Sequence, residues 1–242
     1  MWSELDRSGW VFANTDVGKA QLLALTKIGS GTFTLTGDSN YRGLTRVGAG
    51  TLQVAGSITT TNFIIVSNNA TLDLPGTITA NTVQINSGGT LTGCGSINGN
   101  MLNNGTVFSD CGGTLEISGN VTNNGTMQFV NGSGLAVSGT FINNGLFDLL
   151  TSLQNLPANL INNGTVLLAT NIVVTSFTKT GSDISLTIYG YDGHTYQLQR
   201  TATISNANWQ NIGPSQDGTG APLSFTDTPG GSQNFYRVAV SP

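Results

Sequence analysis

The stretch that decides the fold runs from Met101 to Leu168. It reads as four variants of one segment: MLNNGTVF at 101–108, VTNNGTMQF at 121–129, FINNGLFDL at 141–149 and LINNGTVLL at 160–168. The glycines of the four Asn-Asn-Gly units are Gly105, Gly125, Gly145 and Gly164, so the repeat has an almost constant length. A period of roughly 20 residues, built from short strands and glycine turns, is typical of a β-solenoid in which each period is one coil.

The same period can be followed through most of the chain as three columns of apolar residues. Three columns predict three strands per coil, and therefore a triangular prism with stacked side chains inside. About four extra residues between Leu91 and Met101 predict an inserted loop at 92–99. The expected columns are Leu52, Leu72, Leu91, Leu115 and Leu135; Ile58, Ile78, Met101, Val121, Phe141 and Leu160; and Phe63, Val83, Val107, Met127, Phe147 and Val166. Glycines expected at corners in left-handed conformations are Gly50, Gly89, Gly113, Gly125, Gly134 and Gly145.

Charged residues make up only 8% of the chain, against about 25% in an average globular protein. The net charge is −4, and there is no Lys or Arg between Arg46 and Lys179. Nucleic-acid binding needs clustered cations, so we expect no nucleic-acid partner. No apolar run approaches the ~20 residues of a membrane span, so we expect no membrane insertion. The first residues lack the basic start and apolar run of a signal peptide.

Residues 25–54 carry a second, longer pattern. They resemble the autotransporter-associated, or passenger-associated, β-strand repeat, which implies a secreted or surface right-handed β-helix and no catalytic residue. Asn40 falls one place from the usual asparagine of that repeat. The matching positions are Leu25, Lys27, Gly29, Gly31, Thr32, Leu35, Gly37, Tyr41, Gly43, Thr45, Val47, Ala49, Gly50, Thr51, Leu52 and Val54.

The two ends of the chain differ from this middle. Residues 1–24 precede any repeat, and we expect them to cap the open end of the solenoid at residues 25–172. Residues 175–242 contain most of the tyrosines and strand-like runs separated by glycine and proline turns, which predict a small antiparallel β-sandwich. Their pattern of Tyr196, Trp209, Phe225 and Phe235-Tyr-Arg resembles a C-terminal β module of large secreted bacterial proteins.

Right-handed β-helices also include pectin-degrading enzymes, so a polysaccharide-degrading or carbohydrate-binding protein is the alternative interpretation. Lyases of that kind need a base, and hydrolases need paired carboxylates. The four acids of the cation-free stretch do not fall on one column at consecutive coils: Asp73, Asp110, Glu116 and Asp148. We therefore assign no catalytic, cofactor-binding or metal-binding residue and expect no cofactor.

Three weaker candidates have simpler explanations. His194 follows Tyr191-Asp192-Gly193 and is expected to be a surface turn residue, because one histidine defines no catalytic triad. Asp192 and Asp217 lie in turns, but the calcium-binding nonapeptide of β-rolls is absent. An ice-binding face needs threonines in register, and the pairs Thr32/Thr34 and Thr77/Thr79 are not expected to repeat so.

Two further sets of residues concern stability. Asn104, Asn124, Asn144 and Asn163 are expected to stack as a hydrogen-bonded ladder along one corner. Cys94 and Cys111 are an even pair whose separation is close to the length of one coil, which favours a disulfide in a secreted protein. Their different phases in the repeat place them near different corners, so the disulfide would need the loop at 92–99 to fold back.

These observations together predict an all-β chain with a right-handed triangular parallel β-helix, in coils of about 20 residues, followed by the small sandwich. The favoured function is a non-enzymatic structural or adhesive protein of the bacterial surface. Head-to-tail self-association into filaments is expected, because solenoid ends expose unpaired strand edges. A surface glycan or another matrix protein is the expected further partner.

Overall fold

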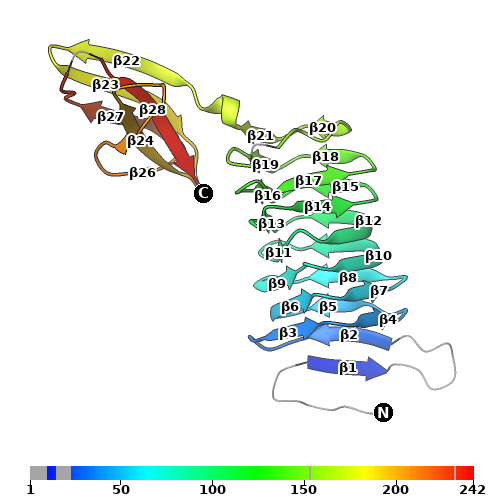
Figure 1. The fold of residues 1–242 in the computed structure, drawn as a ribbon. Helices are drawn as coiled ribbons and strands as arrows, with labels where there is room; N and C mark the ends of the chain where they lie inside the picture. Colours follow the sequence, from blue (N-terminus) through cyan, green and yellow to red (C-terminus); the bar gives the residue numbers. More distant parts are fainter. Residues whose placement is uncertain (1–9, 15–22, 153, 232) are drawn as a thin grey trace. The chain divides into compact units, whose positions relative to one another are not determined.

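A computed structural model describes residues 10–14, 23–152, 154–231 and 233–242. They form two compact units, residues 1–167 and 168–242. The first unit is a parallel β-solenoid whose coils stack along one axis (Figure 1). The chain is all-β apart from one short 3-10 helix, η1 (Ala169–Asn171), among these residues. Within the same ranges, no helix has the length and apolarity needed to cross a membrane.

Each full coil contributes three strand segments, so the solenoid has three columns of strands. One column is β2 (Leu23–Lys27), β5 (Thr45–Val47), β8 (Phe63–Val66), β10 (Thr77–Ile85), β12 (Ser96–Asn103), β15 (Val121–Asn123), β18 (Phe141–Asn143) and β20 (Leu160–Asn162). The second is β3 (Thr32–Leu35), β6 (Gly50–Val54), β9 (Ala70–Asp73), β11 (Thr90–Thr92), β13 (Thr106–Ser109), β16 (Thr126–Phe129), β19 (Leu146–Leu149) and β21 (Thr165–Leu168).

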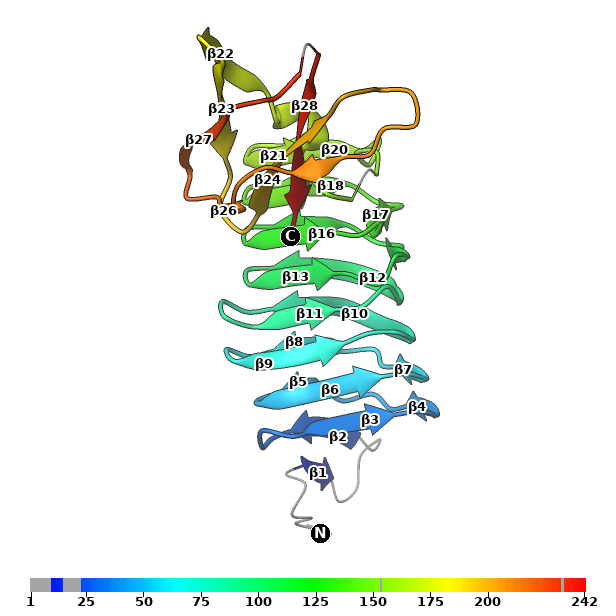
Figure 2. The same cartoon turned by 60° about the vertical axis from the view of Figure 1, so that its left-hand side comes forward.

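The third column is shorter and is seen at one side of the stack in Figure 2. It consists of β4 (Asp38–Asn40), β7 (Ser57–Thr59), the first halves of β10 and β12, β14 (Thr114–Ile117) and β17 (Gly134–Val137). β10 and β12 each serve two columns, because an irregularity between Thr79 and Thr82 turns the strand without ending it.

Along the strands, side chains that point into the solenoid alternate with side chains that point out, and the inward ones form the core. In the second column Leu52, Leu72 and Leu91 lie in register and have no exposed surface, while the residues beside them face out. Burying one such side chain contributes about 1.5–3 kcal/mol, so a full column stabilises the stack substantially. Towards the last coils the core becomes aromatic: the Phe147 ring meets Phe141 edge-on at 5.0 Å and Phe129 at 6.0 Å.

The predicted alignments of Leu52 with Leu72 and Leu91, and of Ile58 with Ile78, are correct. Phe63 is wrongly placed, because it pairs with Thr82 and is 39% exposed, while Ile64 is the buried partner of Val83. Beyond Leu91 the predicted residues of each column still pair with one another, as Met101 does with Val121, but they are joined to the wrong residues of the earlier coils.

Leu91 pairs with Val107 in the next coil, and not with Leu115. The segment at 92–99 is no insertion; the coil is shortened instead. Two residues join β12 to β13 where four join β10 to β11, and Gly99 alone stands where Ala80 and Asn81 stand one coil earlier. Leu115 and Leu135 are buried and paired with each other, but in the third column.

The same shift changes the other two predicted columns. Ile58 and Ile78 continue into Ile97 and Ile117, whereas Met101 follows Val83 and leads to Val121. The residues missing from the coil before β13 are compensated by extra residues after it, where four residues separate β13 from β14. The number of residues in each turn therefore varies from coil to coil, while the strands stay in register.

At the start of the solenoid, β1 (Trp10–Asn14) pairs antiparallel with β2. The rest of the predicted cap, residues 1–9 and 15–22, lies outside the described residues. At the other end, the last strand, β21, ends at Leu168, somewhat before the predicted limit of 172.

The second unit contains two small antiparallel sheets. β22 (Val174–Thr180), β23 (Asp183–Gly190) and β27 (Ala221–Asp227) form one. β24 (Thr195–Thr201) pairs with β25 (Gln210–Asn211), β26 (Gln216–Asp217) and β28 (Phe235–Ser241) in the other. Residues of both sheets share one core: Leu186, Ile188, Leu223, Phe225, Tyr196 and Leu198.

Candidate functional site

The Asn-Asn-Gly repeats build two parallel ladders of asparagine side chains, not one. The predicted ladder is exposed: Asn124 donates to Asn104 at 2.9 Å, Asn144 to Asn124 at 2.9 Å and Asn163 to Asn144 at 3.0 Å. The second ladder, which the sequence analysis missed, is made by the preceding residue of each repeat. Its members are Asn103, Asn123, Asn143 and Asn162.

The inner ladder lies inside the solenoid, except for its last member, Asn162, which is exposed. Asn123 is fully buried; its Nδ2 donates to Asn143 Oδ1 at 2.7 Å and to the carbonyl of Leu146 at 3.0 Å. Its Oδ1 accepts from Asn103 Nδ2 at 2.8 Å and from the backbone N–H of Gly125 at 3.2 Å. Buried polar groups are costly unless paired, and here all four bonds of the amide are made. The signal for this ladder was available, because Asn123 lies two residues after buried Val121 in an alternating strand.

The two ladders run in opposite directions. Inner amides donate towards the next coil, from Asn103 to Asn123, whereas outer amides donate towards the previous coil, from Asn124 to Asn104. The bond dipoles of neighbouring rows therefore oppose each other. The inner amide of Asn123 makes all four of its bonds, and the outer row adds one bond between each pair of neighbouring coils, so this corner stabilises the stack.

The glycine of each repeat is needed for a different reason from the predicted one. A Cβ on Gly125 would lie 2.1 Å from the carbonyl oxygen of Gly105, and one on Gly145 equally close to that of Gly125. Of the six corner glycines expected to be left-handed, only Gly50 is so, with φ of 62°. In the described part of the solenoid, the left-handed non-glycine residues are Asn69 and Asn131. Stacked coils approach too closely at the Asn-Asn-Gly corner for any side chain.

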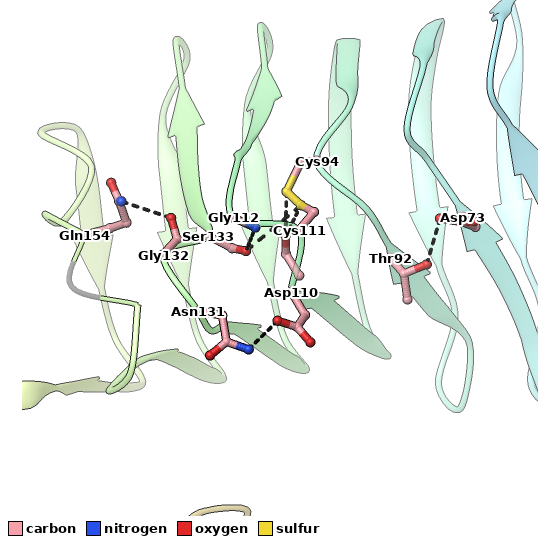
Figure 3. Close-up of a disulfide and its surroundings, with 11 residues drawn as sticks. Asp73, Thr92, Cys94, Asp110, Cys111, Gly112, Asn131, Gly132, Ser133 and Gln154 are labelled. Atoms are coloured by element: carbon pink, nitrogen blue, oxygen red, sulfur yellow. Dashed lines mark hydrogen bonds between the residues drawn. A yellow bond between two sulfur atoms is a disulfide. The ribbon is translucent and has the colours of Figure 1, made fainter. Parts of the chain in front are cut away.

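Cys94 and Cys111 meet at another corner of the solenoid and are joined as a disulfide (Figure 3). Cys94 lies between β11 and β12 and Cys111 between β13 and β14, so both occupy the same corner of neighbouring coils. Their predicted placement near different corners is wrong, because the shortened coil brings Cys111 into line with Cys94. The Ser109 hydroxyl lies 3.0 Å from Cys94 Sγ and 3.2 Å from Cys111 Sγ.

The four acids of the stretch without Lys or Arg are each held by a neighbouring coil. Asp73 accepts from Gln53 at 2.7 Å and from Thr92 at 3.3 Å, and Asp110 accepts from Asn131, as Figure 3 shows. Glu116 accepts from Ser96 at 3.3 Å and Asp148 from Gln128 at 3.2 Å. Within the described part of the chain, no group of three His, Cys, Asp or Glu side chains could hold a metal ion.

One smaller expectation is wrong and another holds. His194 is not a surface residue: only 2% of it is exposed, and its carbonyl accepts from the N–H of Gly218 at 2.8 Å. The pairs Thr32/Thr34 and Thr77/Thr79 do not repeat as pairs, because Thr34 pairs with Gln53, and Thr77 with Ser57 and Ser96. Single threonines do repeat in register on the outer face of the second column, which the sequence pattern did not predict: Thr32, Thr51, Thr71, Thr90, Thr106 and Thr126.

Residues 25–54 form most of the coil that starts the solenoid, β2 to β4, and the two strands that follow it, β5 and β6. Lys27 is buried, and its ammonium donates to the carbonyls of Ile28, Gly29 and Ala49 at 2.8–3.1 Å. Burial lowers the pKa of Lys27. The lysine thus ties two successive turns together, and Gly29 and Gly50 supply the positive φ values that let those turns form.

Tyr41 completes this coil. Its hydroxyl bonds to the hydroxyl of buried Thr45, which binds the long connection after β4 to the next strand. Burial raises the pKa of Tyr41, and the bond to Thr45 opposes this rise more weakly.

Residues 25–54 match the family model described as passenger-associated-transport-repeat (PATR). The chain contains this repeat. No curated protein and no solved structure matches the chain. The repeat occurs in autotransporter passengers, which accords with a secreted or surface location. Its matched residues are those that close the first coil, so the repeat describes a way of building a coil and not a catalytic site.

Proposed function

We propose that this protein is an extracellular structural and adhesive protein of the bacterial cell surface, without enzymatic activity, and that it stacks head to tail. The solenoid is proposed to be right-handed and triangular, as the repeat implies. The PATR match supports the location, and the ladders of hydrogen bonds and buried columns support a mechanically resistant, structural role. Each solenoid acid is engaged by a neighbouring coil, which supports a non-enzymatic role.

The observation that carries the head-to-tail stacking is that strand edges are unpaired at the two ends of the solenoid. Among the described strands, β3 and β21 are the edges of the second column, and β1 covers only β2 at the first end. The inward residue of the last coil is less covered than its counterpart one coil earlier: Leu160 is half-buried, while Phe141 is fully buried. Open edges and uncovered core favour another copy as the next coil.

The free edge of β3 can be blocked without disturbing its bonds to β6. Gly31 and Leu35 face β6, since their carbonyls accept from Thr51 and Ala55. In a parallel strand the N–H of Thr34 therefore points to the open side. Thr34→Pro removes that donor and blocks pairing there. Thr34→Ala is the matched control, because it loses the same hydroxyl bond to Gln53 and keeps the N–H.

Light scattering and negative-stain microscopy at micromolar concentration test the proposal. We expect wild type and Thr34→Ala to form elongated assemblies and Thr34→Pro to remain short or monomeric. A wild-type protein that is monomeric under these conditions contradicts stacking. Assemblies unaffected by Thr34→Pro contradict the role of the β3 edge.

A further inference from the structure

The second unit contains a cavity of about 470 Å³ on the side of its first sheet. Pocket-sized cavities with aromatic walls and a few polar groups are the usual form of small-ligand sites. Side chains of β22, β23 and β28 and of the loop before β28 line it. The lining includes Phe177, Lys179, Gln233, Asn234 and Tyr236.

The walls combine three kinds of group. Phe177 and Tyr236 are aromatic, and Phe177 is 55% exposed, an unusual state for a phenylalanine in a packed unit. Gln233 and Asn234 bring amides that can both donate and accept hydrogen bonds. Lys179 is the only charged residue of the lining, which includes no carboxylate.

The charge of Lys179 is available in a way that the other cations of the unit are not. Arg200 is paired with Asp227 at 2.6 Å, and Arg237 lies 4.5 Å from the Trp209 ring centroid and donates to Gln199. Lys179 is exposed and lines the cavity. A ligand in the cavity therefore meets a positive charge with no acid in the wall.

The wall is also held in place before any ligand arrives. The Tyr236 hydroxyl donates to Asp227 at 2.9 Å, the same carboxylate that pairs with Arg200. The Asn234 amide donates to the carbonyl of Gly230 at 3.2 Å, which fixes the loop beside it. A fixed site loses less conformational entropy on binding than a mobile one.

We propose that this cavity binds an acidic sugar, a uronate unit of an extracellular polysaccharide. Aromatic side chains pack against the C–H faces of a sugar ring, the two amides suit its hydroxyls, and Lys179 pairs with its carboxylate. The proposal rests on the proposed adhesive function and gives it a ligand class. It does not depend on head-to-tail stacking, since it uses the second unit alone.

The test measures binding of an oligogalacturonate and of its methyl ester to the full chain by titration calorimetry. We expect tighter binding of the acid than of the ester. Lys179→Gln should weaken binding of the acid about tenfold and remove the difference, the loss of about 1.4 kcal/mol being typical of one charge-assisted bond. Phe177→Ala should weaken binding of both compounds. Both residues are exposed, so neither change threatens the fold.

Arg46→Gln, on the outside of the solenoid, changes the net charge equally and should alter neither affinity. Binding of neither compound to the wild type overturns the proposal. So does a preference for the acid that survives Lys179→Gln, or an equal affinity for polyglutamate, which would indicate attraction to charge alone. Monodisperse protein that still binds the acid separates this result from a failure of stacking.

Discussion

Cys94 and Cys111 occupy the same corner of two successive coils, with their Cα atoms 6.2 Å apart. This separation lies within the range that a disulfide spans. The short coil between Leu91 and Val107 is what brings them together, because a coil of ordinary length would offset them along the strand direction. The disulfide thus fastens the place where the coil length changes.

We predict no free thiol in the denatured, unreduced protein and two after reduction. Cys111→Ser should lower the free energy of unfolding by roughly 3 kcal/mol, as expected for a crosslink that closes a loop of this size. The double variant Cys94→Ser/Cys111→Ser is the control. If the bond is responsible, the double variant unfolds at the same temperature as the single one. Two thiols in the unreduced protein would refute the crosslink.

The inner asparagine ladder should contribute more to stability than the outer one. Asn123→Ala removes the donor to the buried Oδ1 of Asn143 and the acceptor of the buried Asn103 amide, and a buried group left unpaired costs about 1–3 kcal/mol. Asn124→Ala removes an exposed bond to Asn104 and should cost less than about 1 kcal/mol. Urea denaturation of both variants measures the difference. Equal costs would mean that the inner ladder has no special role.

The sequence predicts the solenoid well because its core is periodic. Leu52, Leu72 and Leu91 could be aligned from their spacing alone, and the structure places them in register. The alignment failed at Val107, because residues lost at the Asn104-Gly105 turn reappear after Ser109. The sequence distance between two residues of one column gives only the total number of residues in a coil. It does not show which turn of the coil has gained or lost residues.

The same limit explains what was missed at the asparagine corner and in the second unit. Asn103 and Asn104 are adjacent and identical, and only the strand phase tells which points inward; a buried amide is unexpected until its partners in the next coil are known. His194 was expected in solvent because it follows a glycine turn, yet the packing of the unit buries it. The cavity beside Phe177 combines the consecutive strands β22 and β23 with β28, which is distant in sequence, so no local pattern indicates it.

Close contact between coils makes the repeated glycines sensitive to any side chain. Gly125→Ala would place a methyl group 2.1 Å from the Gly105 carbonyl oxygen, a backbone atom that cannot move alone. We expect a cost of about 1–3 kcal/mol or more. Gly37→Ala is the matched control, since it meets open space at an ordinary φ and should change stability by less than about 0.5 kcal/mol. Thermal unfolding compares them, and equal melting temperatures would contradict the stacking geometry.

The stability of the first coil should depend on pH through Tyr41. Burial raises the pKa of Tyr41 above its ordinary value of 10.0, so the folded chain keeps the phenol protonated where the unfolded chain loses the proton. Its contribution is therefore fully present below about pH 10 and declines as the pH rises further. Thermal unfolding between pH 8 and roughly pH 11.5 should show a steeper loss for the wild type than for Tyr41→Phe. Tyr189→Phe, at an exposed tyrosine of the second unit, is the control and should follow the wild type. Parallel curves for wild type and Tyr41→Phe would show that the phenol of Tyr41 titrates as freely in the coil as in the unfolded chain.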